Sequence, residues 1–501
     1  MARQRYKVAI LGAGFGGLGM AARLKESGES SFVVLEKAGR IGGTWRDNTY
    51  PGCACDVPSH LYWYSFDTQP DWSHVFSPQS EILRGLESFA ARRGLNEDIR
   101  LNTEVTAAQW DDHECAWHIR TANCGEIIAN ALVTAWGQLN RPKLPDIDGR
   151  EIFTGISFHS ARWQHDTSLG GKRVGCIGNG ASAVQIIPEI AQQAEHLTVF
   201  QRSASHVVPR QDRAYTEEER RTFTHDLSSL LADREAVYLD FESRFHAMRP
   251  GSAKAEEFTT IARTNLEAQI SDPVLREKLW PDYPLGCKRV LLSDDFYPAM
   301  TRSNVILVTE RIAHIESGGV RTADGRLHQL DVIIYATGFE TTSFLGVTDI
   351  TGRARRSLRN EWGGVPQAYL GMTVAGFPNM FMLYGPNTNL GHNSIIAMLE
   401  CQFSYVLQAL HVLEEKRTTA LEVRADAMER FNCDLQERLH GSAWLAGCTN
   451  WYKTADGRIT NNWCGSVEDY KAETAQLQLS DYDLLITEAE LAPSAHSFDQ
   501  D

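Results

Sequence analysis

KVAILGAGFGG (residues 7–17) and RVGCIGNGASA (residues 173–183) are the two stretches that decide the fold of this chain. In each, an apolar strand runs into small residues at the spacing of a dinucleotide-binding fingerprint. Small residues at this turn let the backbone approach a pyrophosphate at the N-terminus of the following helix. They are Gly12, Gly14 and Gly17 in the first copy and Gly178, Gly180 and Ala183 in the second. Two copies predict two Rossmann-like units, each with its own nucleotide.

The residues that choose between nucleotides differ in the two copies. A second apolar strand ends at Glu36 after the first copy and at Arg202 after the second, at the same distance from the first glycine. A carboxylate accepts hydrogen bonds from a ribose diol, whereas a guanidinium pairs with a 2′-phosphate. The first site therefore suits FAD or NAD, and the second suits NADPH. Two nucleotides in one chain predict electron transfer between them.

Composition narrows the class of protein. The 501 residues are too many for one core, and 43% apolar with 23% charged residues is typical of a soluble enzyme. A net charge of −15 argues against nucleic acid as a partner. We find no apolar run of membrane-spanning length, no signal peptide and no metal motif. The ten cysteines form no C-x-x-C pair, which predicts reduced thiols and a cytoplasmic location.

The order of the elements predicts an α/β fold with two Rossmann-like domains. We expect a split FAD-binding domain, with its first part at 1–145 and its second part, with the C-terminal segment, at 329–501. The NADPH-binding domain is expected at 146–328, with a charged helical insertion at about 212–282. That insertion is either a solvated set of helices or, in part, a wall of the substrate pocket. The strand in DVIIYATGFE (331–340) is assigned to the second FAD part.

Two loops hold further candidate residues. GGTWRDNTYPGCACD (42–56) has the glycines, proline and aromatic residues of a rigid loop crossing a flat ring system, with Asp56 near that ring. The alternative is a purely structural aromatic loop. FTGISFHSARW (153–163) lies between the two nucleotide units. Its His159 is either a structural hydrogen-bonding residue or one that orders the linker when NADPH binds.

These loops resemble the signatures of type I Baeyer–Villiger monooxygenases. The resemblance extends over essentially the whole chain, including GPNTNLGHNS (385–394) and NWYKTADGRITNNW (450–463). One departure is Gln164, where the family usually has Pro or Asp. The residues that match the signatures are Phe153, Gly155, His159 and Trp163 in one, and Gly42, Gly43, Trp45, Tyr50, Pro51, Gly52 and Asp56 in the other.

The resemblance implies an FAD- and NADPH-dependent monooxygenase. Such an enzyme inserts one oxygen atom from dioxygen next to a ketone carbonyl through a C4a-peroxyflavin, giving an ester or lactone. It also implies a catalytic arginine, Arg289, in the Lys-Arg pair of PLGCKRVLL (284–292), with Asp56 holding the guanidinium. Lys288 resembles a helper of Arg202 at the 2′-phosphate, and Trp451 resembles a residue that contacts NADP.

The candidate site residues fall into two groups. The predicted catalytic residues are Arg289 and Asp56. The predicted cofactor-binding residues are Gly12, Gly14, Phe15, Gly17, Glu36, Lys37, Gly43, Thr44, Trp45, Asp56, Tyr62, Val105, Asn387, Gly178, Gly180, Ala181, Ser182, Arg202, Ser203, Lys288, Thr337, Gly338 and Trp451.

Other functions remain open on the sequence. A flavin-containing N- or S-monooxygenase would share both nucleotide units, but its electrophilic hydroperoxyflavin would not require an arginine. An uncoupled NADPH oxidase or a nucleotide-binding regulatory protein is a third class. A redox pair formed by Cys53 and Cys55 is disfavoured, because one intervening residue strains a disulfide ring. LYWYSF (61–66) favours a small hydrophobic ketone, but neither its identity nor the oligomeric state is readable.

Overall fold

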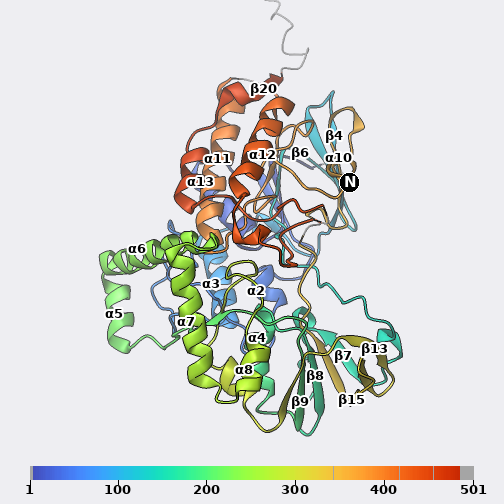
Figure 1. Cartoon of the computed structure of the whole chain (residues 1–501). Coiled ribbons are helices and arrows are strands. Elements are labelled where there is room, and N and C mark those ends of the chain that lie inside the picture. The colour runs from blue at the N-terminus through green and yellow to red at the C-terminus, as the bar shows by residue number, and fades with distance from the viewer. Residues whose placement is uncertain (1–3, 342–343, 417, 455, 486–501) are drawn as a thin grey trace, which may run out of the picture.

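The computed structural model describes residues 4–341, 344–416, 418–454 and 456–485. Two sheets dominate it, one in the upper and one in the lower half of Figure 1, with a helical insertion at one side. The architecture confirms the predicted α/β class with two Rossmann-like units.

The first sheet grows from the first fingerprint. Apolar β1 (Gln4–Leu11) pairs in parallel with β2 (Phe32–Leu35), and α1 (Phe15–Glu26) connects them. The strand order is β17-β4-β5-β6-β1-β2-β3, with β18 paired to β6. The remaining strands are β3 (Ile99–Arg100), β4 (Val105–Asp111), β5 (Ala116–Thr121), β6 (Gly125–Thr134), β17 (Asp349–Thr351) and β18 (Met380–Met382). Because β17 and β18 come from the second half of the chain, this unit is split in sequence, as predicted.

The second sheet has the order β12-β9-β8-β16-β7 and is parallel throughout. Its fingerprint unit is β8 (Arg173–Ile177), α4 (Ala181–Ile190) and β9 (His196–Phe200). The other strands are β7 (Ile156–His159), β12 (Val305–Val308) and β16 (Val332–Tyr335).

The position of β16 corrects the predicted domain boundary. We assigned the strand after 329 to the second FAD part, but β16 pairs with β7 and β8 inside the second sheet. The chain returns to the first unit only after Tyr335, where Phe339 bridges to Pro142 on the outgoing linker. An apolar strand of this kind fits the parallel part of either sheet, so its sequence does not determine which strands it pairs with.

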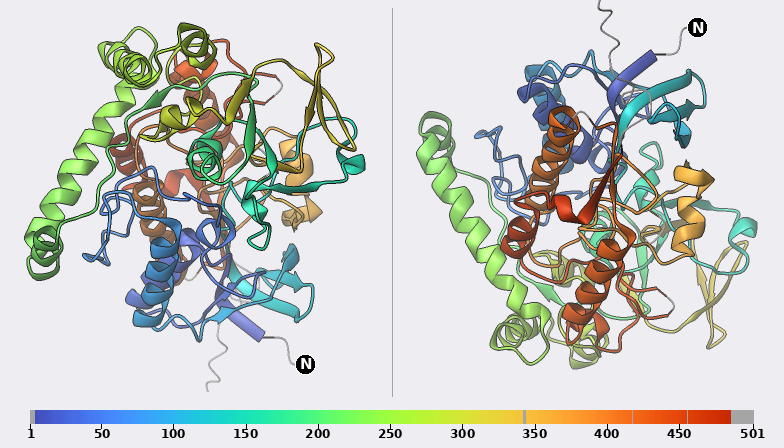
Figure 2. Two further views of the ribbon diagram at one scale, coloured as in Figure 1. Left: turned by 90° about the horizontal axis from the view of Figure 1, so that it is seen from below. Right: turned by 90° about the horizontal axis from the view of Figure 1, so that it is seen from above.

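The charged stretch folds into the predicted helical insertion. It comprises α5 (Glu217–His225), α6 (Leu227–Ser243), the 3₁₀ turn η3 (Arg244–Met248), α7 (Ala253–Gln269) and α8 (Pro273–Leu279). Thr216 opens α5 with a capping box to Glu219, and Ser252 caps α7. Helices α5 and α6 lie at the periphery in Figures 1 and 2, whereas η3 turns back toward the body.

Helix α11 (Ile395–Glu415) is the central helix of the upper half. It packs on α1 and α13, and Gly19 permits this approach because a Cβ there would lie 2.5 Å from the Phe403 ring. By length and composition, it is the one helix in the described part of the chain that could cross a membrane. One face is buried against protein, as in the core helix of a globular domain.

Shorter elements complete the chain. They are α2 (Thr44–Asp47), α3 (Gln79–Arg92), η1 (Arg150–Ile152), η2 (Ser160–Arg162), β10 (Val207–Val208), β11 (Leu291–Leu292), α9 (Phe296–Met300), β13 (Ile312–Glu316), β14 (Gly319–Thr322), β15 (Leu327–Gln329), η4 (Arg353–Arg355), α10 (Leu358–Trp362), β19 (Ala420–Val423), α12 (Ala425–Leu439), η5 (Ala443–Leu445), α13 (Val467–Thr474), η6 (Leu479–Asp481) and β20 (Tyr482–Leu485).

The cysteines depart from the prediction in one place. Cys287 and Cys448 form a disulfide, although all ten cysteines were expected to be reduced. Their separation of 161 residues hides the pairing from any local motif, so only the fold could bring them together. The other cysteines are free, including Cys53 and Cys55, as expected.

Candidate active site

The first fingerprint forms a cradle for a nucleotide from the backbone of its glycines at the N-terminus of α1. Gly12 has φ +108°, and a Cβ there would lie 2.7 Å from the Ala135 carbonyl oxygen. Gly14 precedes α1, whose N-terminus has no side-chain cap. Beside it, the buried Glu36 carboxylate accepts bonds from the Ala13 amide and from Arg46, both at 2.9 Å. This arrangement fits an adenosine diphosphate whose ribose meets a fixed carboxylate.

The predicted ring-crossing loop lies against this cradle. The Gly42 amide donates to the Ala13 carbonyl at 2.8 Å, and a Cβ on Gly43 would lie 3.1 Å from the Gly14 Cα. Trp45 Nε1 donates to the Tyr62 hydroxyl at 3.3 Å. The loop therefore joins the nucleotide fingerprint to an aromatic cluster, which is what a flat ring system requires. Arg46, which fixes Glu36, had no signal in the sequence.

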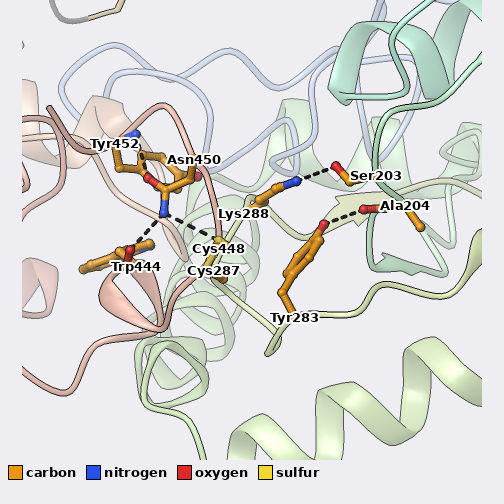
Figure 3. Close-up of a disulfide and its surroundings, with 9 residues drawn as sticks. All are labelled: Ser203, Ala204, Tyr283, Cys287, Lys288, Trp444, Cys448, Asn450 and Tyr452. Atoms are coloured by element: carbon orange, nitrogen blue, oxygen red, sulfur yellow. Dashed lines mark hydrogen bonds between the residues drawn. A yellow bond between two sulfur atoms is a disulfide. The ribbon is translucent and has the colours of Figure 1, made fainter. Parts of the chain in front are cut away.

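The second fingerprint repeats the cradle with cationic residues beside it. Gly178 has φ +111° and faces the Ala336 carbonyl, 2.4 Å from the position of a Cβ. Lys288 Nζ donates to Ser203 Oγ at 2.5 Å, as Figure 3 shows. The pKa of Lys288 is lowered, first by burial and then by the charge of Arg202. An anion beside Lys288 and Arg202 would offset the repulsion between their charges, and a 2′-phosphate is such an anion.

Arg289 and Asp56 meet between the two units. Nε and Nη2 of Arg289 donate to the same Asp56 oxygen, at 2.8 and 2.6 Å. The Asp56 carboxylate raises the pKa of the guanidinium above its ordinary value, so the cation is held permanently. The predicted contact between these residues is therefore present.

A cavity opens beside this pair. Its polar side holds Asp56 and Arg289, together with His392 and Asn393 from the loop before α11. Its other wall is largely apolar. The helical insertion contributes Phe241, Arg244, Ala247, Met248 and Phe258 to this wall, and further apolar side chains come from Val57, Val208, Leu285, Val290 and Leu292. Of the two interpretations of the insertion, the structure supports a contribution to the pocket wall.

Glu242 connects the insertion to that loop, and sequence reasoning missed it. Its carboxylate accepts from Asn393 Nδ2 at 2.6 Å and from the Glu468 amide at 3.1 Å, and it lies 3.4 Å from His392 Nε2. Although burial opposes ionisation, these contacts lower the pKa of Glu242 to about 2. A charged residue in a charged helix has no local signal that separates it from its solvated neighbours.

Both ring nitrogens of His159 form hydrogen bonds with the backbone, which is typical of a structural histidine. Its Nδ1 accepts from the Ala161 amide at 3.1 Å, so Nε2 carries the proton and donates to the Gly338 carbonyl at 3.0 Å. Burial lowers the pKa of this imidazole. Gly338 also accepts from the Lys143 amide, so His159 joins both linkers between the units. It touches neither Arg289 nor Asp56 through a hydrogen bond described here.

The remaining candidates spread over both units. Thr337 donates to the Lys143 carbonyl and so joins the two linkers. Asn387 donates to the carbonyls of Ile459 and Asn462 in the C-terminal segment. Lys37 and Ala181 are exposed beside the first and second cradles. The last members are Val105 at the start of β4, Ser182 in the first turn of α4, Phe15 against Tyr62, Thr44 opening α2, Trp163 against Phe158, Phe153 beside Gly155, and Trp451 against Tyr452. No cluster of metal-ligating side chains occurs among the described residues.

Comparisons with known proteins agree with this geometry. A family model described as an NAD(P)-binding Rossmann-like domain matches residues 10–78. A Baeyer–Villiger monooxygenase of Pseudomonas aeruginosa is 41% identical, over 97% of this chain and 93% of its own. One of Streptomyces coelicolor is 42% identical, over 96% and 93%.

Solved structures show the same fold. An oxidised steroid monooxygenase bound to NADP has a TM-score of 0.85 and 31% identity, covering 96% of this chain and 100% of that one. A closed cyclohexanone monooxygenase has a TM-score of 0.87 and 28% identity, covering 97% and 100%.

Fold and site together define a flavoprotein oxygenase with two nucleotide sites around a partly buried arginine–carboxylate pair. The chain belongs to the Baeyer–Villiger monooxygenase family. It uses FAD and NADPH and inserts one oxygen atom from dioxygen next to a ketone carbonyl. The alternative of an N- or S-monooxygenase gains no support from these comparisons.

Proposed function

We propose that Arg289, held by Asp56, is the catalytic residue of this oxygen insertion. The observation that supports it is the pair of hydrogen bonds from Arg289 to one Asp56 oxygen, at the edge of the cavity. Bound FAD, reduced by NADPH, supplies the activation of dioxygen. Arg289 stabilises negative charge that develops on oxygen, because a guanidinium stays protonated and offers donors in a fixed plane.

Asp56 fixes the direction of those donors. Its bonds use Nε and Nη2, which leaves Nη1 of Arg289 for the reacting oxygen. The chain thus provides a preoriented cation in a partly closed site.

The two nucleotides are assigned to the two cradles. FAD is held by Gly12, Gly14 and Glu36 with the loop 42–56, and NADPH by Gly178 and Gly180 with Arg202 and Lys288. The support is the carboxylate beside the first cradle and the paired cations beside the second. The cavity wall from α6, η3 and α7 supports a small hydrophobic ketone as the substrate.

The proposed compartment is the cytoplasm, where the free cysteines would stay reduced. Fractionation of cells that express the chain from its own promoter tests this location.

The test of the function is product analysis of Arg289→Ala. The FAD-loaded variant is mixed anaerobically with NADPH to follow flavin reduction, then aerobically with linear, cyclic and aryl ketones. We expect normal reduction, hydrogen peroxide, and ester formation lowered at least ~10³-fold. Arg221→Ala, an exposed arginine of α5, is the control. Retention of most ester formation by Arg289→Ala would refute the assignment.

A further inference from the structure

The Cys287–Cys448 disulfide lies where the two halves of the proposed active site meet. Cys287 directly precedes Lys288 and Arg289 and is fully buried, whereas Cys448 is partly exposed in the C-terminal segment. The Cα atoms are 6.3 Å apart. Figure 3 shows the bond beside Lys288, whose ammonium group points away from it toward Ser203.

The other end of the disulfide is tied to the segment that includes Trp451. Asn450 Nδ2 donates to Cys448 Sγ at 3.6 Å and to the Trp444 carbonyl at 2.9 Å. The Asn450 side-chain oxygen accepts from the Tyr452 amide at 3.0 Å. The rings of Trp451 and Tyr452 are 4.3 Å apart, and Tyr452 is buried. One covalent bond therefore connects the cationic nucleotide site to a segment whose other end is anchored by the buried Tyr452 side chain. Around Cys448 itself, the anchors are the hydrogen bonds of Asn450.

We propose that Cys287–Cys448 is a redox-sensitive clasp that holds residues 448–452 on the NADPH site. In the oxidised form the segment is fixed beside Lys288, and NADPH binds a preordered site. In the reduced form Tyr452 stays buried, but the part of the segment around Cys448 loses its covalent bond and must be reordered on binding, which weakens affinity. The inference rests on the proposed roles of Lys288 and Trp451 in NADPH binding.

The switching step is thiol–disulfide exchange with a dithiol. One thiolate of the dithiol attacks the partly exposed Cys448 sulfur, the S–S bond breaks, and Cys287 leaves as a thiolate that takes up a proton. The second thiol of the dithiol then displaces Cys448, which also leaves as a thiolate and is protonated. Two electrons pass to the protein, which gains two thiols, and the dithiol ends as its own disulfide.

Linkage makes the proposal quantitative. If reduction weakens NADP⁺ binding by some factor, bound NADP⁺ must shift the thiol–disulfide equilibrium toward the disulfide by the same factor. A structural crosslink without influence on the nucleotide site would leave that equilibrium unmoved. We expect a factor of about ten.

The experiment uses the FAD-loaded full chain, equilibrated with glutathione and glutathione disulfide. Peptide mapping after acid quenching and alkylation gives the fraction of Cys287–Cys448 crosslink with and without NADP⁺. Calorimetry gives the Kd of NADP⁺ for the oxidised enzyme, the dithiothreitol-reduced enzyme and Cys448→Ser. Cys433→Ser, which removes an exposed free thiol on α12, is the matched control.

We expect the reduced enzyme and Cys448→Ser to bind NADP⁺ about tenfold more weakly, and Cys448→Ser to be insensitive to dithiothreitol. Absence of the crosslink in glutathione disulfide, or equal Kd values within twofold for oxidised and reduced enzyme, would overturn the clasp. Lys288→Ala separates this from the nucleotide assignment. If Lys288→Ala leaves the Kd unchanged, the assignment itself is wrong, whatever the crosslink does.

Discussion

Arg289 places Nε and Nη2 on a single oxygen of Asp56, although 233 residues separate the two in the chain. Asp56 ends the loop that crosses the first nucleotide cradle, and Arg289 follows the helical insertion of the second unit. The contact therefore connects the two units, in addition to forming the proposed catalytic pair. Any change that separates the units should act on it.

Loss of the Asp56 charge should uncouple the enzyme without blocking flavin reduction. Asp56→Asn keeps the size of the side chain but removes the charge that orients Arg289. A charge-assisted hydrogen bond contributes about 1.5–3 kcal/mol, so ester formation should fall about 10- to 100-fold while peroxide rises. Stopped-flow reduction and product analysis measure both. Asp483→Asn, an exposed carboxylate of β20, is the control, and equal coupling in the two variants would contradict the role.

Arg202 should decide between the two nicotinamide nucleotides. Arg202→Ala removes a guanidinium whose charge acts on Lys288, the second cation of the proposed phosphate site. The kcat/KM for NADPH should fall about 10- to 100-fold, while that for NADH changes little, because only NADPH has a 2′-phosphate. Steady-state kinetics with both nucleotides measure the preference. An unchanged ratio of the two kcat/KM values would show that another residue reads the phosphate.

The lowered pKa of Lys288 predicts an alkaline limit on NADPH use. Burial and the nearby Arg202 favour the neutral amine, so Lys288 loses its charge at a lower pH than an ordinary lysine. As the pH rises through that pKa, kcat/KM for NADPH should fall, whereas kcat/KM for NADH should lack this decline. Lys288→Arg should remove it, since arginine stays protonated. Superimposable alkaline profiles for the two nucleotides would contradict this.

Substitution of Gly180 tests nucleotide binding without a change in protein packing. A Cβ at this position meets nothing within 4 Å, and its backbone has φ −81°. Gly180→Ala should therefore change the unfolding free energy by less than roughly 0.5 kcal/mol. If the pyrophosphate lies over the cradle, NADP⁺ binding should weaken at least about tenfold, because the methyl group occupies the approach. Thermal unfolding and calorimetry measure the two effects, and unchanged affinity would place the nucleotide elsewhere.

Gly178→Ala is the counterpart to Gly180→Ala. Its φ of +111° and the Ala336 carbonyl at 2.4 Å from a Cβ forbid a side chain even without ligand. The free energy of unfolding of this variant should fall by about 1–3 kcal/mol. Its NADP⁺ binding should weaken as well. The contrast between the two glycines separates a ligand effect from a folding effect.

Local patterns were enough for much of the fold. The two strand–glycine–helix stretches specified both nucleotide units, and Glu36 and Arg202 support the proposed assignment of their nucleotides. The charged periodicity of 217–279 predicted helices, and the Lys288–Arg289 pair was found through its resemblance to a family. Each nucleotide fingerprint lies within about 30 residues, and each helix is set by its own local periodicity, so neighbouring residues alone predict these elements.

Other features depended on contacts between distant parts of the chain. The apolar strand 332–335 could have joined either sheet, and hydrogen bonding to β7 and β8 placed it in the second. Cys287 and Cys448 looked like free thiols until folding brought them together, and Glu242 looked like one solvated charge among many.

The sequence by itself thus determined the fold class, the two nucleotide units and the residue types that choose their nucleotides, because these follow from short-range geometry. Only the tertiary structure decided which strand lies in which sheet, which helices wall the cavity and how Arg289 is oriented. Those properties arise from side chains that meet across hundreds of residues. Packing and charge select the partners of these side chains as the chain folds.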